Sequence, residues 1–387
     1  MPFFTAAKIH DGHKWLPGRT VIETTEDGTI IQLHDASDGK EVTFCEGVLT
    51  PGFVNAHCHL ELSHMKGVIP EHLTLIPFLK NIPLYRNDFT DEQKEKARHS
   101  AYAELLSNGV VAVGDISNVT DTLDLRGLDK LHIHTFVESL GFAENPQKQF
   151  ERSVHVYDTF ASQKSGTKRL RQSIVPHAPY SVSLSLFRMI NAHQKDAVIS
   201  IHNQESPAED EYYFSKTGSV GELLQVLGID DGFFQPSGKS SLQTYLEWLS
   251  PSHPFIFVHN TYTALNDLKI AKALLKDPFW CLCPNANLYI ESKLPDVGMF
   301  VKEHANICIG TDSLASNHQL SILSELQTLR ENFPALSWET LLTWGTYNGA
   351  KALQMDDIVG SFEPGKKPGI IQITRLEEKD SLIKRVI

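Results

Sequence analysis

The sequence lacks several features that define other classes of protein. It has no run of about 18 apolar residues, which a membrane-spanning helix requires, and its N-terminal stretch MPFFTAAKIHDGHKW has no basic region followed by a long apolar core. We therefore expect no membrane span and no signal peptide, and we expect a cytoplasmic protein. Its five cysteines form no C-x-x-C pair, which argues against a disulfide framework and against a cysteine-based zinc site.

Positive charge is also scarce. The 387 residues include 35 Lys and Arg against 47 Asp and Glu, which gives a net charge of −12. Nucleic acids and anionic membranes are bound by clustered positive charge, so neither is an expected partner. A hydrophobic content of 41% is ordinary for a globular protein, and a small-molecule substrate fits this composition better.

Both ends of the chain have short strand-like segments separated by turn signals. Residues 20–24 and 29–33 are β-rich and are bounded by Asp-Gly pairs, and residues 360–373 contain two turns that lead into a strand. We expect residues 1–50 and 356–387 to form one small, β-sandwich-like domain.

Between these ends, strand-like apolar runs alternate with helical patterns such as residues 91–108 and 320–332. Counting the strand that ends at His57 and His59, there are eight runs, the others at 109–115, 132–137, 172–177, 198–202, 254–259, 279–283 and 306–312. Eight alternating strand and helix units predict an α/β fold, a (β/α)8 TIM barrel, over residues 51–355.

The stretch VNAHCHLE places His57 and His59 one residue apart in the first of these strands. Alternate residues of a strand point to the same side, so the two imidazoles converge. This arrangement suits a divalent metal ion, although an isolated H-x-H pair can also arise by chance in a chain with 18 histidines.

Other polar residues close the predicted strands where a barrel gathers its chemistry. They are His177, His202, His259 and Asp312. Each alone is compatible with a structural histidine or a helix-capping aspartate, but the set favours a site. Imidazoles with one carboxylate suit Zn²⁺ or Fe²⁺, and an open position lets the metal lower the pKa of bound water towards ~7.

Hydrolysis also needs a group that carries a proton to the leaving group. Glu205 follows His202 by three residues and is our candidate, although alone it also reads as a solvated loop carboxylate. Cys281 and Cys283 alternate in a buried strand, and we interpret them as core residues rather than ligands.

Several longer phrases carry a family resemblance. They are Pro51-Gly52-Phe53-Val54-Asn55-Ala56-His57-Cys58-His59, Pro176-His177-Ala178-Pro179-Tyr180-Ser181, His202-Asn203-Gln204-Glu205, Cys283-Pro284-Asn285-Ala286-Asn287-Leu288 and Gly310-Thr311-Asp312-Ser313-Leu314-Ala315-Ser316-Asn317. With these phrases the chain resembles the amidohydrolase superfamily, in its aminohydrolase branch of purine, pyrimidine and nucleoside deaminases.

The resemblance implies a role for each matching residue. His57, His59, His202 and Asp312 correspond to the ligands of one metal ion, and no lysine closes the fourth strand to bridge a second. Asp312 also corresponds to the acceptor of a proton from water, Glu205 to the group that protonates the ring, and His259 to a contact of the hydrolytic water. His177 and Asn287 correspond to substrate contacts. The usual C-terminal Gly-Lys-x-Ala-Asp appears here as Gly365-Lys366-Lys367-Pro368-Gly369. A homodimer is compatible with the resemblance, because this fold often dimerises.

The phrase His57-Cys58-His59-Leu60-Glu61-Leu62-Ser63 resembles the opening of aminofutalosine deaminases, which act on an adenosine-like nucleoside; Leu62 replaces their aromatic residue. Glu61 and Ser63 are candidate substrate contacts, and Arg86 is a candidate partner for a substrate carboxylate, although all three also suit a solvated surface. We therefore expect a metal-dependent deaminase of an aminated heterocycle such as a 6-aminopurine nucleoside. A guanine or cytosine deaminase, a hydrolase of a ring amide or another leaving group, and a non-enzymatic relative remain the alternatives.

Overall fold

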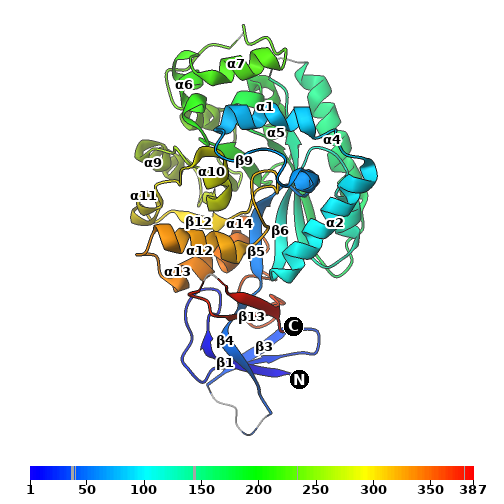
Figure 1. Cartoon of the computed structure of the whole chain (residues 1–387), viewed down its shortest axis with the longest axis vertical. Helices are drawn as coiled ribbons and strands as arrows, with labels where there is room; N and C mark the ends of the chain where they lie inside the picture. The colour runs from blue at the N-terminus through cyan, green and yellow to red at the C-terminus, as the bar shows by residue number, and fades with distance from the viewer. Residues whose placement is uncertain (36–38, 40, 143–144, 233, 379) are drawn as a thin grey trace.

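The computed structural model describes residues 1–35, 39, 41–142, 145–232, 234–378 and 380–387. Figure 1 shows a small β domain at one end of the molecule, where both chain termini lie, and a larger ring of strands and helices at the other.

The small domain is a single six-stranded sheet in the order β14-β13-β4-β1-β2-β3. Its strands are β1 (Phe3–Ile9), β2 (Val21–Thr24), β3 (Ile30–His34), β4 (Thr43–Pro51), β13 (Ile370–Thr374) and β14 (Leu382–Arg385). The two ends of the chain join because β4 pairs antiparallel with β13. Ile22, Leu49 and Ile370 are buried in its core. This confirms a β domain built from both ends, while its boundaries at residues 50 and 356 remain a prediction.

All eight predicted barrel strands are present, and the predicted TIM barrel is confirmed. They are β5 (Phe53–Cys58), β6 (Val110–Ser117), β7 (His132–Ser139), β8 (Leu170–Pro176), β9 (Ile199–Asn203), β10 (Phe255–His259), β11 (Phe279–Leu282) and β12 (Asn306–Ile309). They pair in parallel as two four-stranded sheets, β5-β6-β7-β8 and β9-β10-β11-β12. The last strand is shorter than predicted because it stops at Ile309, and Asp312 has a left-handed backbone with φ 56°.

Two junctions close the ring of strands. The amide of His202 donates to the carbonyl of His177 at 3.0 Å, and Cys58 forms a parallel bridge with Asp312. Gly310 lies at the second junction, where a Cβ atom would lie 2.8 Å from both the Cβ and the carbonyl oxygen of His57. The absence of a side chain there lets the strands meet directly behind the first histidine.

Helices surround the barrel (Figure 1). They are α1 (Leu75–Tyr85), α2 (Asp91–Ser107), α3 (Leu123–Gly127), α4 (Pro146–Ser162), α5 (Leu184–His193), α6 (Pro207–Ser215), α7 (Ser219–Val226), α8 (Ser241–Tyr245), α9 (Leu265–Leu274), α10 (Pro284–Glu291), α11 (Val297–Lys302), α12 (Ile322–Asn332), α13 (Trp338–Thr343) and α14 (Gly349–Ala352). Short helical turns are at Leu60–Met65, Pro179–Ser181, Leu246–Trp248 and Trp344–Asn348.

The main core lies between strands and helices and includes the fully buried side chains of Phe257 and Trp280. Helices α1 and α7 contact each other beyond the barrel, on the side away from the small domain (Figure 1). Within the described part of the chain, no helix combines the length and apolar character needed to cross a bilayer.

Candidate metal centre and active site

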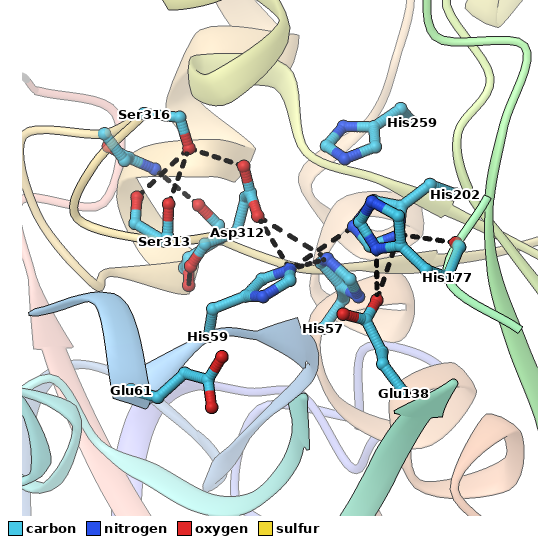
Figure 2. A network of polar contacts seen from close by, with 12 residues as sticks. His57, His59, Glu61, Glu138, His177, His202, His259, Asp312, Ser313 and Ser316 are labelled. Atoms are coloured by element: carbon cyan, nitrogen blue, oxygen red, sulfur yellow. Dashed lines mark hydrogen bonds and ion pairs between the residues drawn. The ribbon is translucent and has the colours of Figure 1, made fainter. Parts of the chain in front are cut away.

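Five side chains from four strand ends converge at one end of the barrel. His57 and His59 come from the end of β5, His202 from β9, His259 from β10 and Asp312 from the loop after β12. All five are buried, and Figure 2 shows the rings of His57, His59 and His202 turned toward one another beside Asp312.

The spacing of their donor atoms fits a single metal ion. Nε2 of His59 lies 3.1 Å from Nε2 of His57 and 3.3 Å from Nε2 of His202, and 3.3 Å from Oδ1 of Asp312. Zinc–nitrogen bonds of about 2.0–2.1 Å in a tetrahedron give ligand separations of about 3.3 Å. These four residues could therefore hold one divalent cation.

His259 is a further member of this cluster. One of its ring nitrogens lies within 4.8 Å of ligand atoms of His57, His202 and Asp312, so distance alone would allow His259 in place of His59. The shorter separations favour His59 as the ligand and leave His259 at the edge. Nε2 of His259 instead faces Glu205, 3.7 Å from its Oε1.

Neighbouring groups fix which ring nitrogens face the centre. Nδ1 of His202 donates to the carbonyl oxygen of His177 at 2.8 Å, and Nδ1 of His259 donates to Oδ1 of Asn287 at 3.1 Å. The Nε2 lone pairs are therefore free to face inward, as metal ligation requires. Burial lowers the pKa of His57 to about 4 and that of His202 well below its ordinary range, which keeps both rings neutral.

The two functional carboxyl groups have opposite pKa shifts. Burial alone would raise the pKa of Asp312, but the imidazoles of His57, His59 and His259 bring it well below its ordinary range. Ser316 also donates to Oδ2 of Asp312. Burial raises the pKa of Glu205 well above its ordinary range, and Asp312 raises it further. The site therefore contains an ionised carboxylate that can accept a proton and a neutral carboxyl that can donate one.

Glu138 is a site residue that the sequence analysis missed. It is the penultimate residue of β7, is fully buried, and accepts a hydrogen bond from Nδ1 of His177 at 2.8 Å (Figure 2). Its Oε1 also lies 3.3 Å from Nδ1 of His202. Burial acts to lower the pKa of His177, yet Glu138 raises it overall. A polar residue closing an apolar run was the available signal, but the strand was predicted to stop at residue 137.

A cavity of ≈ 430 Å³ opens beside the metal centre and is lined by His59, His177, His202, Glu205, His259 and Asp312. Glu61 and Arg86 also line it, as the sequence analysis expected of substrate contacts. Both carboxylate oxygens of Glu61 accept hydrogen bonds from Asn118, at 2.9 Å each. Ser63 and Asn287 are absent from this lining. The hydroxyl of Ser63 donates to the carbonyl of Leu60, and Asn287 orients His259.

The cavity has two chemically different sides. We call His59, His202, Glu205, His259 and Asp312 the metal-facing floor; His57 is fully buried and is not in the lining. The apolar wall comprises Leu75, Phe78, Leu79 and Ile82 of α1, Leu223 and Leu224 of α7, and Leu227. The wall includes accessible apolar side chains, since Leu227 is 47% exposed.

The barrel with histidines and an aspartate at the carboxyl ends of its strands defines a metal-dependent hydrolase. The amidohydrolase family model matches residues 48–381, and the chain belongs to this family.

Individual relatives are similar over most of the length of this chain. The chain is 28% identical over 335 residues to an adenosine deaminase of Helicobacter pylori, covering 85% of this chain and 79% of the relative. The solved H. pylori aminofutalosine deaminase in complex with methylthio-coformycin has a TM-score of 0.83 at 23% identity, with 100% of both chains covered. A Xanthomonas campestris adenosine deaminase with bound zinc has a TM-score of 0.75 at 22% identity, covering 98% of this chain and 86% of that one. These structures establish a common fold.

Proposed function

We propose that this chain is a metal-dependent hydrolytic deaminase of a 6-aminopurine nucleoside. The observation that carries the proposal is the position of the Glu205 carboxyl, which lines the cavity beside the ligand cluster and faces His259 at 3.7 Å. Deamination requires a proton donor for the ring nitrogen next to the reacting carbon, and burial, which raises the pKa of Glu205 well above its ordinary range, suits this carboxyl to that task. The names of the similar H. pylori proteins, adenosine deaminase and aminofutalosine deaminase, support the substrate class.

We assign the metal to His57, His59, His202 and Asp312, and zinc is our first choice because the similar X. campestris structure has zinc bound. Ferrous iron suits the same donors. Bound there, a divalent cation would supply a water molecule acidified enough to attack carbon at neutral pH.

The chain's own residues then accept and donate the protons of the reaction. Asp312, whose Oδ2 accepts a hydrogen bond from Ser316, accepts a proton from the attacking water. Glu205 delivers a proton to the purine N1, which makes C6 a better electrophile. When the C6–N bond breaks, Asp312 passes its proton to the departing amine, which leaves as ammonia. Glu205 recovers a proton from the new C6 hydroxyl as the ring carbonyl forms. His259 is oriented by Asn287 and hydrogen-bonds to the oxygen that adds to C6. His177 contacts the substrate ring, with Glu138 fixing the orientation of its imidazole.

The remaining cavity supports a substrate larger than adenine. The apolar wall suits an apolar part of the nucleoside's substituent, and Glu61 suits hydroxyl donors. A second, polar cavity of ≈ 420 Å³ shares Asn118, Glu138 and Gln149 with the first and is also lined by Arg86 and Arg152. Two arginines that line one cavity suit a carboxylate, which aminofutalosine carries.

The test is the rate of ammonia release from purified zinc-loaded and iron-loaded protein. Aminofutalosine, 5′-methylthioadenosine, S-adenosylhomocysteine and adenosine are compared with guanine, cytosine, a cyclic amide and a chlorinated triazine. We expect the highest kcat/KM among the adenosine derivatives, full loss with a chelator, and recovery with one metal ion per chain. Efficient turnover confined to guanine or cytosine would overturn the purine nucleoside assignment, and turnover confined to the cyclic amide or the triazine would overturn deamination.

We also propose cytoplasmic residence and a homodimer. All five cysteines are buried and unpaired, which suits a reducing compartment. Light scattering of the purified protein measures the oligomeric state, and fractionation of the source cells measures the location.

A further inference from the structure

The Glu205 side chain has little direct support. Among the described residues, its carboxyl makes no hydrogen bond, and its nearest ionisable partner is Nε2 of His259 at 3.7 Å. Its direction therefore depends on the backbone that carries it, which follows the end of β9.

The residue before it, Gln204, is held unusually firmly. Its side-chain amide donates to Oδ2 of Asp267 at 2.8 Å and to Oδ2 of Asp210 at 3.1 Å. Its backbone amide donates to Oε1 of Glu209 at 3.0 Å, and its carbonyl accepts from the amide of Tyr262 at 2.9 Å. The side chain is fully buried, so all its polar groups are matched inside the protein.

These bonds hold a backbone conformation that residues with side chains rarely adopt. Gln204 has φ +44°, in the left-handed region, which is unfavourable for a non-glycine residue. Such a conformation persists only when its surroundings impose it. The side-chain amide of Gln204 donates to two carboxyl groups, one on α6 and one on α9, and its backbone amide donates to a third carboxyl group, on α6.

The metal ligand two residues earlier is held by a separate contact. Nδ1 of His202 donates to the carbonyl of His177, on the opposite side of β9 from the Gln204 contacts. Loss of the Gln204 contacts should therefore disturb Glu205 and leave the ligand cluster intact.

We propose that Gln204 is a positioning residue: its amide, clamped by Asp267 and Asp210, fixes the left-handed turn that aims Glu205 at the substrate ring. This inference rests on the proposed function for its kinetic readout only. A misplacement of about 1 Å in a proton donor costs up to about a hundredfold in rate.

The first test is Gln204→Met, which keeps the length of the side chain and removes both donors. We expect kcat to fall about 10- to 100-fold, with KM and bound metal within twofold of the parent. The matched control is Gln243→Met, because Gln243 donates to the other oxygen of the same Asp267, at 2.6 Å, without contacting Gln204. Its kcat should stay within about threefold. Equal losses in both variants, or a loss that follows bound metal, would contradict positioning.

A double variant that reverses the polarity of one hydrogen bond distinguishes lost positioning from misfolding. Gln204→Glu faces Asp267 with a second carboxylate, and Asp267→Asn faces Gln204 with a second amide, so each alone should lower kcat. Together they restore one hydrogen bond of reversed polarity at position 267, where the new amide oxygen can still accept from Ser240 and Gln243. The contact with Asp210 stays lost, so the recovery should be partial. We expect the double variant to recover at least about tenfold over the worse single variant. Additive losses would overturn the proposal.

A crystal structure of Gln204→Met gives a readout independent of turnover. We expect Glu205 to leave its 3.7 Å approach to His259, while His59 and His202 keep their 3.3 Å separation. An unmoved Glu205 would refute the positioning role even if no substrate were found. Conversely, a parent protein that releases no ammonia from any substrate would refute the proposed function. The position of Glu205 in the crystal structure of Gln204→Met would then still test the role of Gln204.

Discussion

The metal-facing floor and the apolar wall enclose the same cavity but are built on different principles. Three floor residues have a hydrogen-bonding partner that sets their orientation: Asn287 for His259, the His177 carbonyl for His202, and Ser316 for Asp312. The wall is made of leucine, isoleucine and phenylalanine side chains on α1 and α7, which define a shape without directional bonds.

We therefore expect the floor to determine the rate of the chemical step and the wall to determine which substrates bind. The floor lies at strand ends, where the barrel holds atoms to fractions of an ångström, as catalysis requires. The wall lies on helices outside the barrel, where exchange of one apolar side chain changes the volume of the cavity without touching the ligands. Changes in the floor should therefore lower kcat, and changes in the wall should act on KM and on substrate preference.

The largest expected effect is in the floor. Glu205→Gln keeps the shape of the side chain but cannot exchange protons, so kcat should fall at least about a hundredfold while bound metal is unchanged. Steady-state kinetics with elemental analysis measures both. Glu291→Gln is the control, since Glu291 receives bonds from Leu75 and Tyr262 and is not in the lining of the cavity. Near-parental turnover by Glu205→Gln would mean that another group carries the proton.

The floor and the wall also differ in how far the sequence revealed them. His57, His59, His202 and Asp312 could be predicted to converge because strand period and barrel geometry bring strand ends together. Glu138 also lies at the end of a barrel strand. It was not predicted because its strand is two residues longer than expected.

Other features depend on long-range contacts that no local pattern encodes. Gln204 gains its partners from Asp210 and Asp267, 6 and 63 positions along the chain. The apolar residues of α1 and α7 read as ordinary helix packing, because nothing local distinguishes a leucine facing a cavity from one facing a core. Ser63 lies near the ligands in sequence, but its hydroxyl bonds within its own turn, and its contact with the substrate remains a prediction.

The wall should give the next largest effect. Leu79→Asn places a polar amide in the wall, and burying a leucine side chain contributes about 1.5–3 kcal/mol, so partial burial predicts a KM about tenfold higher. The effect should appear with 5′-methylthioadenosine and be smaller with adenosine, while kcat changes little. Leu84→Asn is the matched control, because Leu84 lies on the same helix, is 65% exposed and is not in the lining. A loss confined to kcat would show that Leu79 affects the chemical step, as the floor residues do, rather than substrate binding.

The buried carboxyl of Glu209, which accepts a hydrogen bond from the backbone amide of Gln204, should make the free energy of unfolding depend on pH. Burial raises the pKa of Glu209 to about 8, from an ordinary value of 4.5. The folded state therefore holds a proton that the unfolded state has released, and the carboxyl's contribution to stability is full below pH 4.5 and declines as the pH rises to about 8. Glutamine does not titrate, so Glu209→Gln should gain stability relative to the parent by at least about 1 kcal/mol between about pH 5 and pH 8.

Urea unfolding across this range measures the gain. The control is Glu222→Gln, because the side chain of Glu222 is 72% exposed. A constant difference between Glu209→Gln and the parent would show that Glu209 is ionised in the folded protein throughout.

The smallest effect is expected at Ser63. Its hydroxyl donates to the carbonyl of Leu60 at 2.7 Å and closes the helical turn Leu60–Met65, whereas Glu61 in the same turn lines the cavity. Ser63→Ala removes one buried hydrogen bond, which should lower the free energy of unfolding by about 0.5–1.5 kcal/mol. Both kcat and KM should stay within about twofold, because the turn keeps its other contacts. Glu61→Gln supplies the contrast, since it changes a group that lines the cavity and should raise KM more than Ser63→Ala does. If Ser63→Ala raised KM as much as Glu61→Gln, Ser63 would take part in substrate binding as Glu61 does. The distinction between a residue that supports the turn and a residue that contacts the substrate would then not hold here.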